Sequence, residues 1–298
     1  MHIQYKLGII FICNLLTINA FCQKSTIEND LIQLIKPFEG KVGVSILNLK
    51  TNERIDINGN EKFPMQSVYK FPLAMAVFNQ IDQGKFTLNQ KMNLKKSDLL
   101  PDTHSPLRDL YPNGNSEITL KEIIEKTVSE SDNNGCDFQF RLLGGCKVAH
   151  QFVQSLGIKD ISIVGTEEEM HKNSQVQYEN YATPNAMSKL LALFYQQKAI
   201  SKASTETLWK MMTETITGTN RIKGLLPKGT TVGHKTGWSG ADEKGFTAAV
   251  NDAGIVILPD GNAFAITIFI SETYLKTDKC DQLAANISKL AYDHFLKK

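Results

Sequence analysis

The pattern of apolar and polar residues near the start of the chain predicts a β-hairpin. Residues 42–49 are mainly apolar and β-branched, residues 50–53 are polar, and residues 54–57 alternate between polar and apolar side chains. Two short runs of this kind joined by a polar turn are typical of paired antiparallel strands.

The middle of the chain has the periodicity of helices. In the segment that starts at about residue 67, Leu73, Val77 and Ile81 are apolar and four positions apart. Gly84 follows them as a typical residue at a helix C-terminus. The same pattern predicts further helices over 120–130, 136–143, 147–156 and 184–197, with polar loops over 101–116 and 165–182.

The last third of the chain changes to short runs separated by turn residues. Strands are predicted over 231–235, 245–251, 254–258 and 263–270, turns over 251–254 and 259–262, and a final helix over 279–296. Strands joined by short turns favour an antiparallel sheet. The first hairpin and this meander can share one sheet, with the helical block inserted as a second lobe. A cleft between the two lobes is the expected site.

The first 22 residues are predicted to be a signal peptide. Lys6 supplies a weak positive charge, and residues 7–21 form a largely apolar run that is too short for a good membrane-spanning helix. Export would place the mature chain in the periplasm. Two alternatives rank lower, namely a buried N-terminal helix and a lipoprotein acylated at Cys22.

Composition narrows the function classes. The chain has 298 residues, 42% hydrophobic and 21% charged, with a formal net charge of +2. This mixture excludes a disordered chain, and the lack of a long basic block argues against nucleic acid as a partner. Export would leave Cys136, Cys146 and Cys280, which allow at most one disulfide and have no metal-ligand spacing. No metal site is therefore expected.

A first candidate for chemistry is Ser67 with Lys70 at the start of the predicted long helix. Residues three apart share a helix face, so the lysine lies beside the hydroxyl. A serine nucleophile needs such a base, whose pKa must be lowered by burial or by a second cation. Taken alone, the same residues also fit a helix-capping serine and a surface lysine.

Two further short motifs follow. Ser131 and Asn133 flank an aspartate after a predicted helix, where a hydroxyl could relay a proton and an amide could hold a lysine and a substrate carbonyl. Lys235, Thr236 and Gly237 lie on a predicted strand, where the first two could grip a carboxylate and the glycine would let a ligand approach the backbone. The alternatives are a capping turn and an edge strand protected by a lysine.

The three motifs in this order, S-x-x-K, S-D-N and K-T-G, are a known set of class A β-lactamases and penicillin-binding proteins. The chain from about residue 25 to its end resembles a class A serine β-lactamase. The runs Ser-Glu-Ser-Asp-Asn-Asn-Gly-Cys at 129–136 and His-Lys-Thr-Gly at 234–237 are similar to the PER- and VEB-type extended-spectrum branch.

This resemblance implies an α+β fold with a five-stranded antiparallel sheet flanked by helices, an inserted all-α lobe and an active site between them. The α/β lobe would comprise residues 23–66 and 212–298. The all-α lobe would comprise residues 67–211 and include the Ω-loop at about 163–182.

The resemblance also implies catalytic roles. Ser67 would attack the lactam carbonyl, and Ser131 would pass a proton to the leaving nitrogen. Either Lys70 or Glu167 acting through water would take the proton of the nucleophile, a choice left open for this family. Glu167 would also hold the water that releases the acyl-enzyme, and the two glutamates that follow it would be solvated loop acids.

Substrate contacts are implied for Asn133, Lys235, Thr236, Arg221, Trp238, Ser239, His104 and His171. Arg221 would stand behind the K-T-G strand and reinforce a carboxylate site, and the N–H groups of Ser67 and Trp238 would form the oxyanion hole. His171 replaces the asparagine that most members have, and His104 stands where the family has an aromatic gate. Surface positions are the alternatives for Arg221 and His104.

The expected function is hydrolysis of the β-lactam amide bond of penicillins and cephalosporins, giving antibiotic resistance, by a monomer that acts on small molecules without stable membrane association. The alternatives are a penicillin-binding D,D-peptidase or transpeptidase, and a β-lactam sensor domain that stays acylated.

Overall fold

A five-stranded antiparallel sheet forms the centre of the computed structural model, which describes residues 27–297. The strand order is β2-β1-β9-β8-β7. The strands are β1 (Lys41–Asn48), β2 (Arg54–Ile57), β7 (Val232–Trp238), β8 (Thr247–Ile257) and β9 (Ala263–Thr273). Because β1 pairs with β9, the predicted N-terminal hairpin and C-terminal meander share one sheet, as expected.

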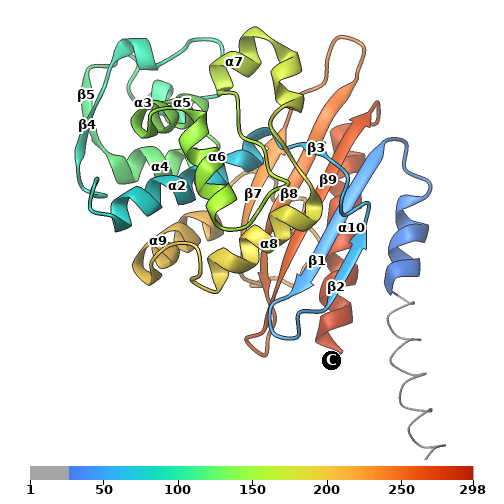
Figure 1. Cartoon of the computed structure of the whole chain (residues 1–298). Coiled ribbons are helices and arrows are strands. Elements are labelled where there is room, and N and C mark those ends of the chain that lie inside the picture. The colour runs from blue at the N-terminus through green and yellow to red at the C-terminus, as the bar shows by residue number, and fades with distance from the viewer. Residues whose placement is uncertain (1–26, 298) are drawn as a thin grey trace, which may run out of the picture.

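The two faces of the sheet are covered differently (Figure 1). The helix α10 (Thr277–Leu296) packs on one face, where its apolar side joins a cluster that includes Ile268 and Ile270 of β9 and the helix over residues 27–35. The helix α8 (Pro184–Tyr195) lies against β1 and β9 on the other face, where Ser188 donates to the carbonyl of Ser45 at 3.0 Å.

The remaining helices form a block beside the sheet (Figure 1). They are α2 (Lys70–Asp82), α3 (Pro106–Leu110), α4 (Leu120–Ser129), α5 (Asn133–Leu143), α6 (Cys146–Ser155), α7 (Glu167–Lys172) and α9 (Lys202–Thr213), with the 3₁₀ turns η1 (Gln66–Tyr69), η2 (Lys96–Asp98) and η3 (Ser174–Tyr178). Two small sheets pair β3 (Phe63–Pro64) with β6 (Tyr181–Ala182) and β4 (Lys91–Leu94) with β5 (Ser116–Thr119). Every residue from Lys70 to Phe78 is buried, so α2 runs through the core of this block.

The predicted helices over 120–130, 136–143, 147–156, 184–197 and 279–296 are confirmed within a few residues. The helix over residues 27–35 and the helices α3, α7 and α9 lie where no helix was predicted. Of these, α3, α7 and α9 each begin after a side-chain N-cap, namely Ser105, Thr166 and Ser201. These caps satisfy N–H groups at helix starts whose short or weakly periodic sequences gave no helical signal.

The predicted turn over 251–254 is wrong, because β8 continues through it as one strand. Asn251 and Asp252 are buried and find long-range partners there. The amide of Asn251 donates to the carbonyls of Pro64 and Met65, and the carboxylate of Asp252 accepts from the ring of His234 at 2.9 Å. The predicted first helix also differs, because residues 66–69 form a 3₁₀ turn before α2 begins.

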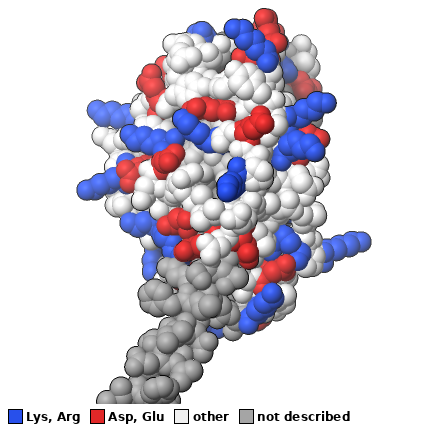
Figure 2. All heavy atoms as spheres, turned by 90° about the vertical axis from the view of Figure 1, so that its right-hand side faces the viewer, with Lys and Arg blue, Asp and Glu red and all other residues white. Residues whose placement is uncertain are grey.

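The predicted signal peptide and Cys22 lie outside the described residues. Among residues 27–297, no helix is both long and apolar enough to cross a membrane. On the face in Figure 2, basic and acidic side chains are interspersed rather than separated into fields of one sign.

Candidate active site

Ser67 lies in the 3₁₀ turn η1, where the chain passes from the sheet into α2. Gln66 before it has a φ of +48°, and no side chain caps the turn, so the helix-capping alternative for Ser67 is wrong. The strand β7 passes close by at Gly237. A Cβ there would lie 2.5 Å from the carbonyl oxygen of Met65 and 3.2 Å from the nitrogen of Ser67. The glycine of the K-T-G motif therefore lets β7 approach the candidate nucleophile.

Lys70 is fully buried at the first position of α2, so the surface-lysine alternative is wrong. Its Nζ lies 3.0 Å from Oε1 of Glu167 and 2.8 Å from the carbonyl oxygen of Ser131, and it also donates to Oδ1 of Asn133. The ammonium is thus surrounded by one carboxylate and two neutral acceptors. A buried lysine needs such partners, since an unpaired buried charge is costly.

The S-D-N motif forms the sharp turn between α4 and α5. Ser131 has a φ of +63°, and Asp132 caps α5 by accepting from the N–H of Gly135 at 2.7 Å. The capping-turn alternative is therefore correct for Asp132. The same turn places Ser131 and Asn133 in the site, where the amide of Asn133 bridges Lys70 and the hydroxyl of Thr103.

Lys235 is fully buried although β7 is an edge strand, so it does not serve as an exposed protective lysine. Its Nζ donates to Oγ of Ser131 at 3.0 Å. Burial, and then the nearby charge of Lys70, lowers the pKa of Lys235 to about 7. Next along the strand, Oγ1 of Thr236 lies 2.6 Å from Oγ1 of Thr217.

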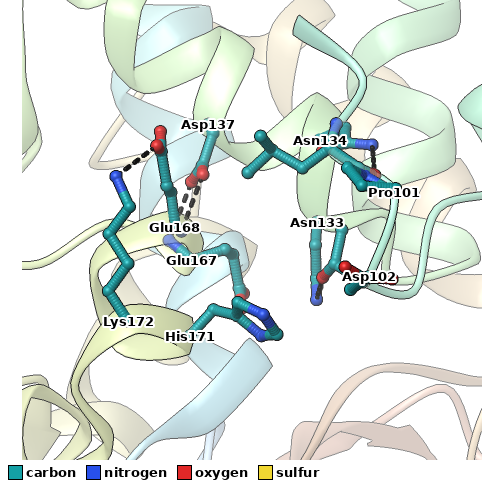
Figure 3. Close-up of a pocket in the computed structure, with 11 residues that line it drawn as sticks. Pro101, Asp102, Asn133, Asn134, Asp137, Glu167, Glu168, His171 and Lys172 are labelled. Carbon is teal, nitrogen blue, oxygen red and sulfur yellow. Dashed lines mark hydrogen bonds and ion pairs between the residues drawn. The ribbon is translucent and has the colours of Figure 1, made fainter.

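Glu167 begins α7, and Asp137 of α5 holds this helix start in place (Figure 3). The carboxylate of Asp137 accepts from the N–H groups of Glu167 at 2.8 Å and Glu168 at 2.9 Å. Burial, then the charge of Glu167, raises the pKa of Asp137 to about 7. Glu168 instead pairs with the exposed Lys172, so Glu167 is the glutamate that faces Lys70.

A pocket of about 300 Å³ opens beside these groups. Its lining includes six residues named from the sequence: Ser67, Asn133, Glu167, His171, Trp238 and Ser239. It also includes five that were missed: Gln66, Thr103, Met170, Ser174 and Gln177. A neighbouring cavity of about 190 Å³, drawn in Figure 3, shares four residues with it and extends to Asp137. Four of the missed residues lie in η1, α7 and η3 and Thr103 lies in a loop, and none belongs to a motif that marks chemistry. Only the position of Asp137 one helical turn after Asn133 was a usable signal.

His104 is not among the residues that line either pocket. Its ring is exposed and donates from Nε2 to the carbonyl of Glu130 at 2.8 Å, while the preceding Thr103 lines both pockets. Thr103 rather than His104 therefore lines the two pockets, and a gate role for His104 stays a prediction. Ser239 lines the larger pocket, and its Oγ accepts from the N–H groups of Ala248 and Ala249, each at 3.1 Å.

Arg221 is buried behind β7, so the surface alternative is wrong. Its Nε lies 2.7 Å from Oδ1 of Asp281, and one terminal nitrogen donates to the carbonyls of Gly237 at 3.2 Å and Asn251 at 2.9 Å. It thus supports the backbone of the strand that carries Lys235. Direct contact of Arg221 with a carboxylate ligand stays a prediction.

Metal ligation finds no support in the described part of the chain. No group of three or more histidine, cysteine or acidic side chains in residues 27–297 could hold an ion. Cys136, Cys146 and Cys280 are free thiols and are all buried. Burial raises the pKa of Cys280 to about 11, so its thiol stays protonated at neutral pH.

Comparisons with known proteins match this geometry. The model of the Beta-lactamase enzyme family matches residues 26–295. Beta-lactamase VEB-1 of Pseudomonas aeruginosa is 42% identical over 267 residues, which is 89% of each chain. Extended-spectrum beta-lactamase PER-1 of the same organism is 38% identical over 276 residues, 93% of this chain and 89% of the relative. The crystal structure of TLA-3 extended-spectrum beta-lactamase superimposes with a TM-score of 0.90 at 46% identity, covering 92% of this chain and 99% of that one.

The family match covers both the sheet and the helical block. The three motifs meet between them, as the resemblance implied. The chain therefore belongs to the beta-lactamase enzyme family, within its class A of β-lactam hydrolases.

Proposed function

We propose that the chain hydrolyses the amide bond of penicillins and cephalosporins through an acyl-enzyme on Ser67, and thereby confers antibiotic resistance. One observation carries this proposal. Lys70 is buried between Glu167, Asn133 and the backbone of Ser131, while Lys235 donates to the hydroxyl of Ser131. Two cations, a carboxylate and a hydroxyl thus form one connected network beside the nucleophile.

In the first stage, Oγ of Ser67 attacks the lactam carbonyl and the carbon–nitrogen bond breaks. The serine proton goes to Glu167 through water, or to Lys70 after Lys70 has given a proton to Glu167 across the 3.0 Å ion pair that joins them. The N–H groups of Ser67 and Trp238 stabilise the oxyanion. Ser131 passes a proton to the departing nitrogen, and Lys235 orients its hydroxyl.

In the second stage, Glu167 takes a proton from water, the resulting nucleophile cleaves the ester on Ser67, and the proton passes to the departing serine oxygen. This step separates a hydrolase from a penicillin-binding peptidase or a sensor, which stays acylated. The support for it is that Asp137 fixes the start of α7 and so keeps Glu167 against Lys70.

Substrate recognition follows from the same arrangement. Lys235 and Thr236 bind the carboxylate that penicillins and cephalosporins share, and Arg221 supports their strand from behind. Asn133, His171 and Ser239 face the acyl side chain from the larger pocket. The names of PER-1 and TLA-3 state an extended spectrum for those enzymes, and we extend this to oxyimino cephalosporins for the present chain.

The setting of the enzyme is also a proposal. The N-terminal segment exports the chain to the periplasm, where β-lactams arrive before they reach their targets. The mature chain acts as a monomer on a small molecule and needs no cofactor.

The decisive experiment is a time course of a chromogenic cephalosporin with the purified chain, with intact-protein mass recorded alongside. We expect many turnovers per enzyme and only a transient adduct. Glu167→Ala should accumulate a stable adduct, while Glu168→Ala, which removes only the exposed pair with Lys172, should not. A single turnover with a persistent adduct in the unmodified chain would instead identify a penicillin-binding protein or a sensor.

A further inference from the structure

Two large apolar side chains are exposed near Thr236, at the end of the site that binds the carboxylate. Ile216 is 66% exposed and Trp238 is 54% exposed, although most large apolar residues of the described chain are buried. Neither has a role in the hydrolytic cycle beyond the backbone N–H of Trp238. An exposed apolar group next to a binding site is informative, because burying it against a ligand is favourable.

Ile216 is held beside this end of the site by its backbone. Its N–H donates to the carbonyl of Ser129 at 3.1 Å, close to the turn that carries Ser131. The next residue, Thr217, places its hydroxyl 2.6 Å from that of Thr236. Ile216 therefore borders one side of a hydroxyl pair that faces the carboxylate site.

Trp238 follows Thr236 on the same strand, two positions along. Strand residues two apart point to the same face, so Trp238 and Thr236 share a face of β7. Gly237 between them faces the segment of Ser67. The backbone of Trp238 pairs with Val250 of β8, so a strand rather than a loop carries the indole.

The chemistry of cephalosporins makes this position specific. Their carboxylate is attached to one ring carbon, and the adjacent carbon, C3, carries a variable substituent. A carboxylate bound by Lys235 and Thr236 therefore brings the C3 substituent to within a few bonds of the rim formed by Ile216 and Trp238. A tryptophan ring favours flat groups, and it favours a cationic ring most of all.

We propose that Trp238 is a specificity-determining residue whose indole stacks on a planar, cationic ring substituent at C3 of a cephalosporin, with Ile216 closing the opposite side. This inference rests on the proposed function, because it assumes the carboxylate site at Lys235 and Thr236. It predicts a preference for substrates with a pyridinium ring at C3 over those with a small alkyl group.

The test compares two cephalosporins that share one acyl side chain and carry either a pyridiniomethyl or a methyl group at C3. For each enzyme the readout is the ratio of the two KM values, which cancels effects common to both substrates. Trp238→Ala should raise the KM for the pyridinium substrate relative to the methyl one by about tenfold. Trp238→Phe should recover part of this preference.

Tyr274→Ala is the matched control. Tyr274 is also an exposed aromatic residue, 67% exposed, but it packs on Phe246 and is not among the residues that line the pocket. Its removal should leave the KM ratio unchanged. An unchanged ratio in Trp238→Ala, or an equal change in Tyr274→Ala, would overturn the inference.

Fluorescence supplies an independent readout, since the chain has two tryptophans. Trp209 packs on Gly233 and Tyr195, away from the pocket lining. In a Ser67→Ala background, which binds without acylation, the pyridinium substrate should quench emission, and adding Trp238→Phe should remove that quench. A quench that persists in the double variant would contradict the stacking. If the unmodified chain neither hydrolyses nor is acylated by either substrate, the proposed function itself fails, and this inference falls with it.

Discussion

Lys70 and Lys235 are both fully buried in the same site, but their surroundings differ. Lys70 has the carboxylate of Glu167 at 3.0 Å, whereas Lys235 donates to neutral oxygens of Ser131 and Thr236. Burial and the charge of Lys70 therefore lower the pKa of Lys235 to about 7. The anion that would restore a normal pKa is the carboxylate of the substrate.

This difference predicts the basic limb of the pH profile. Above about pH 7 the free enzyme loses the charge on Lys235, so kcat/KM should fall, chiefly through a rise in KM. Lys235→Arg should lose plateau activity, about tenfold, yet keep that plateau to higher pH, because a guanidinium stays protonated. Profiles of kcat/KM from pH 5 to 10 for both enzymes measure this. If kcat/KM of the unmodified enzyme and of Lys235→Arg fell at the same high pH, the fall would belong to a group other than Lys235.

The same shift affects stability. The folded pKa is about 7 and the unfolded value is 10.5, so between these values the unfolded chain binds more protons than the folded one. The contribution of Lys235 to the free energy of unfolding therefore increases as pH rises through this window. Below it, both states carry the proton and the contribution is constant.

At the scale of elements, the six-residue helix α7 is positioned by a side chain from another helix. Asp137 of α5 accepts from the first two N–H groups of α7, and Thr166 and Glu169 form a capping box at the same end. These contacts satisfy N–H groups that a helix leaves unpaired at its start. The contact between α5 and α7 therefore fixes the position of Glu167, in addition to the capping box within α7 itself.

Asp137→Asn tests this contact. An amide offers one acceptor oxygen where the carboxylate offers two, so one N–H loses its partner and Glu167 is held less firmly. Deacylation should slow by about tenfold, because the rate falls steeply when Glu167 is displaced from the water that it activates. Acylation should change less. Stopped-flow rates and adduct mass separate the two steps, with Glu168→Gln as the control. Equal slowing of both steps would indicate general damage to the site instead.

At the scale of the whole molecule, Arg221 connects three elements. It bonds Asp281 of α10 and the carbonyls of Gly237 on β7 and Asn251 on β8. The helix behind the sheet is thereby joined to the strand that faces the substrate. A buried guanidinium with all these partners makes the strand rigid where Lys235 and Thr236 must bind a carboxylate.

Arg221→Ala should weaken both folding and binding. It leaves Asp281 and two carbonyls without their donor, at a cost of about 2–3 kcal/mol after allowing for the partial exposure of Asp281. The Tm should fall by about 6 °C, and KM should rise severalfold with a smaller change in kcat. Asp281→Asn, which keeps the bonds to both carbonyls, should lower Tm less and leave KM nearly unchanged. An unchanged KM in Arg221→Ala would show that Arg221 stabilises the fold but does not contribute to substrate binding.

Much of the element order could be predicted from the chain alone, since hairpins and amphipathic helices are local patterns. The hairpin at 42–57 and the helix at 120–130 carry strong periodicity, and both are confirmed. Asn251 and Asp252 show the limit. They have the composition of a turn, but their partners Met65 and His234 lie far away in sequence, and those partners keep them in a strand.

The sequence by itself determined the reactive groups at the centre of the site, because the three motifs name Ser67, Lys70, Ser131 and Lys235 by type and order. Only the tertiary structure decided what state they are in. Lys70 and Asn133 are 63 positions apart, and Lys235 and Ser131 are 104 apart, so no local pattern reports that they meet. Burial, hydrogen-bond partners and shifted pKa values come from such long-range contacts, because they depend on which groups exclude water from one another.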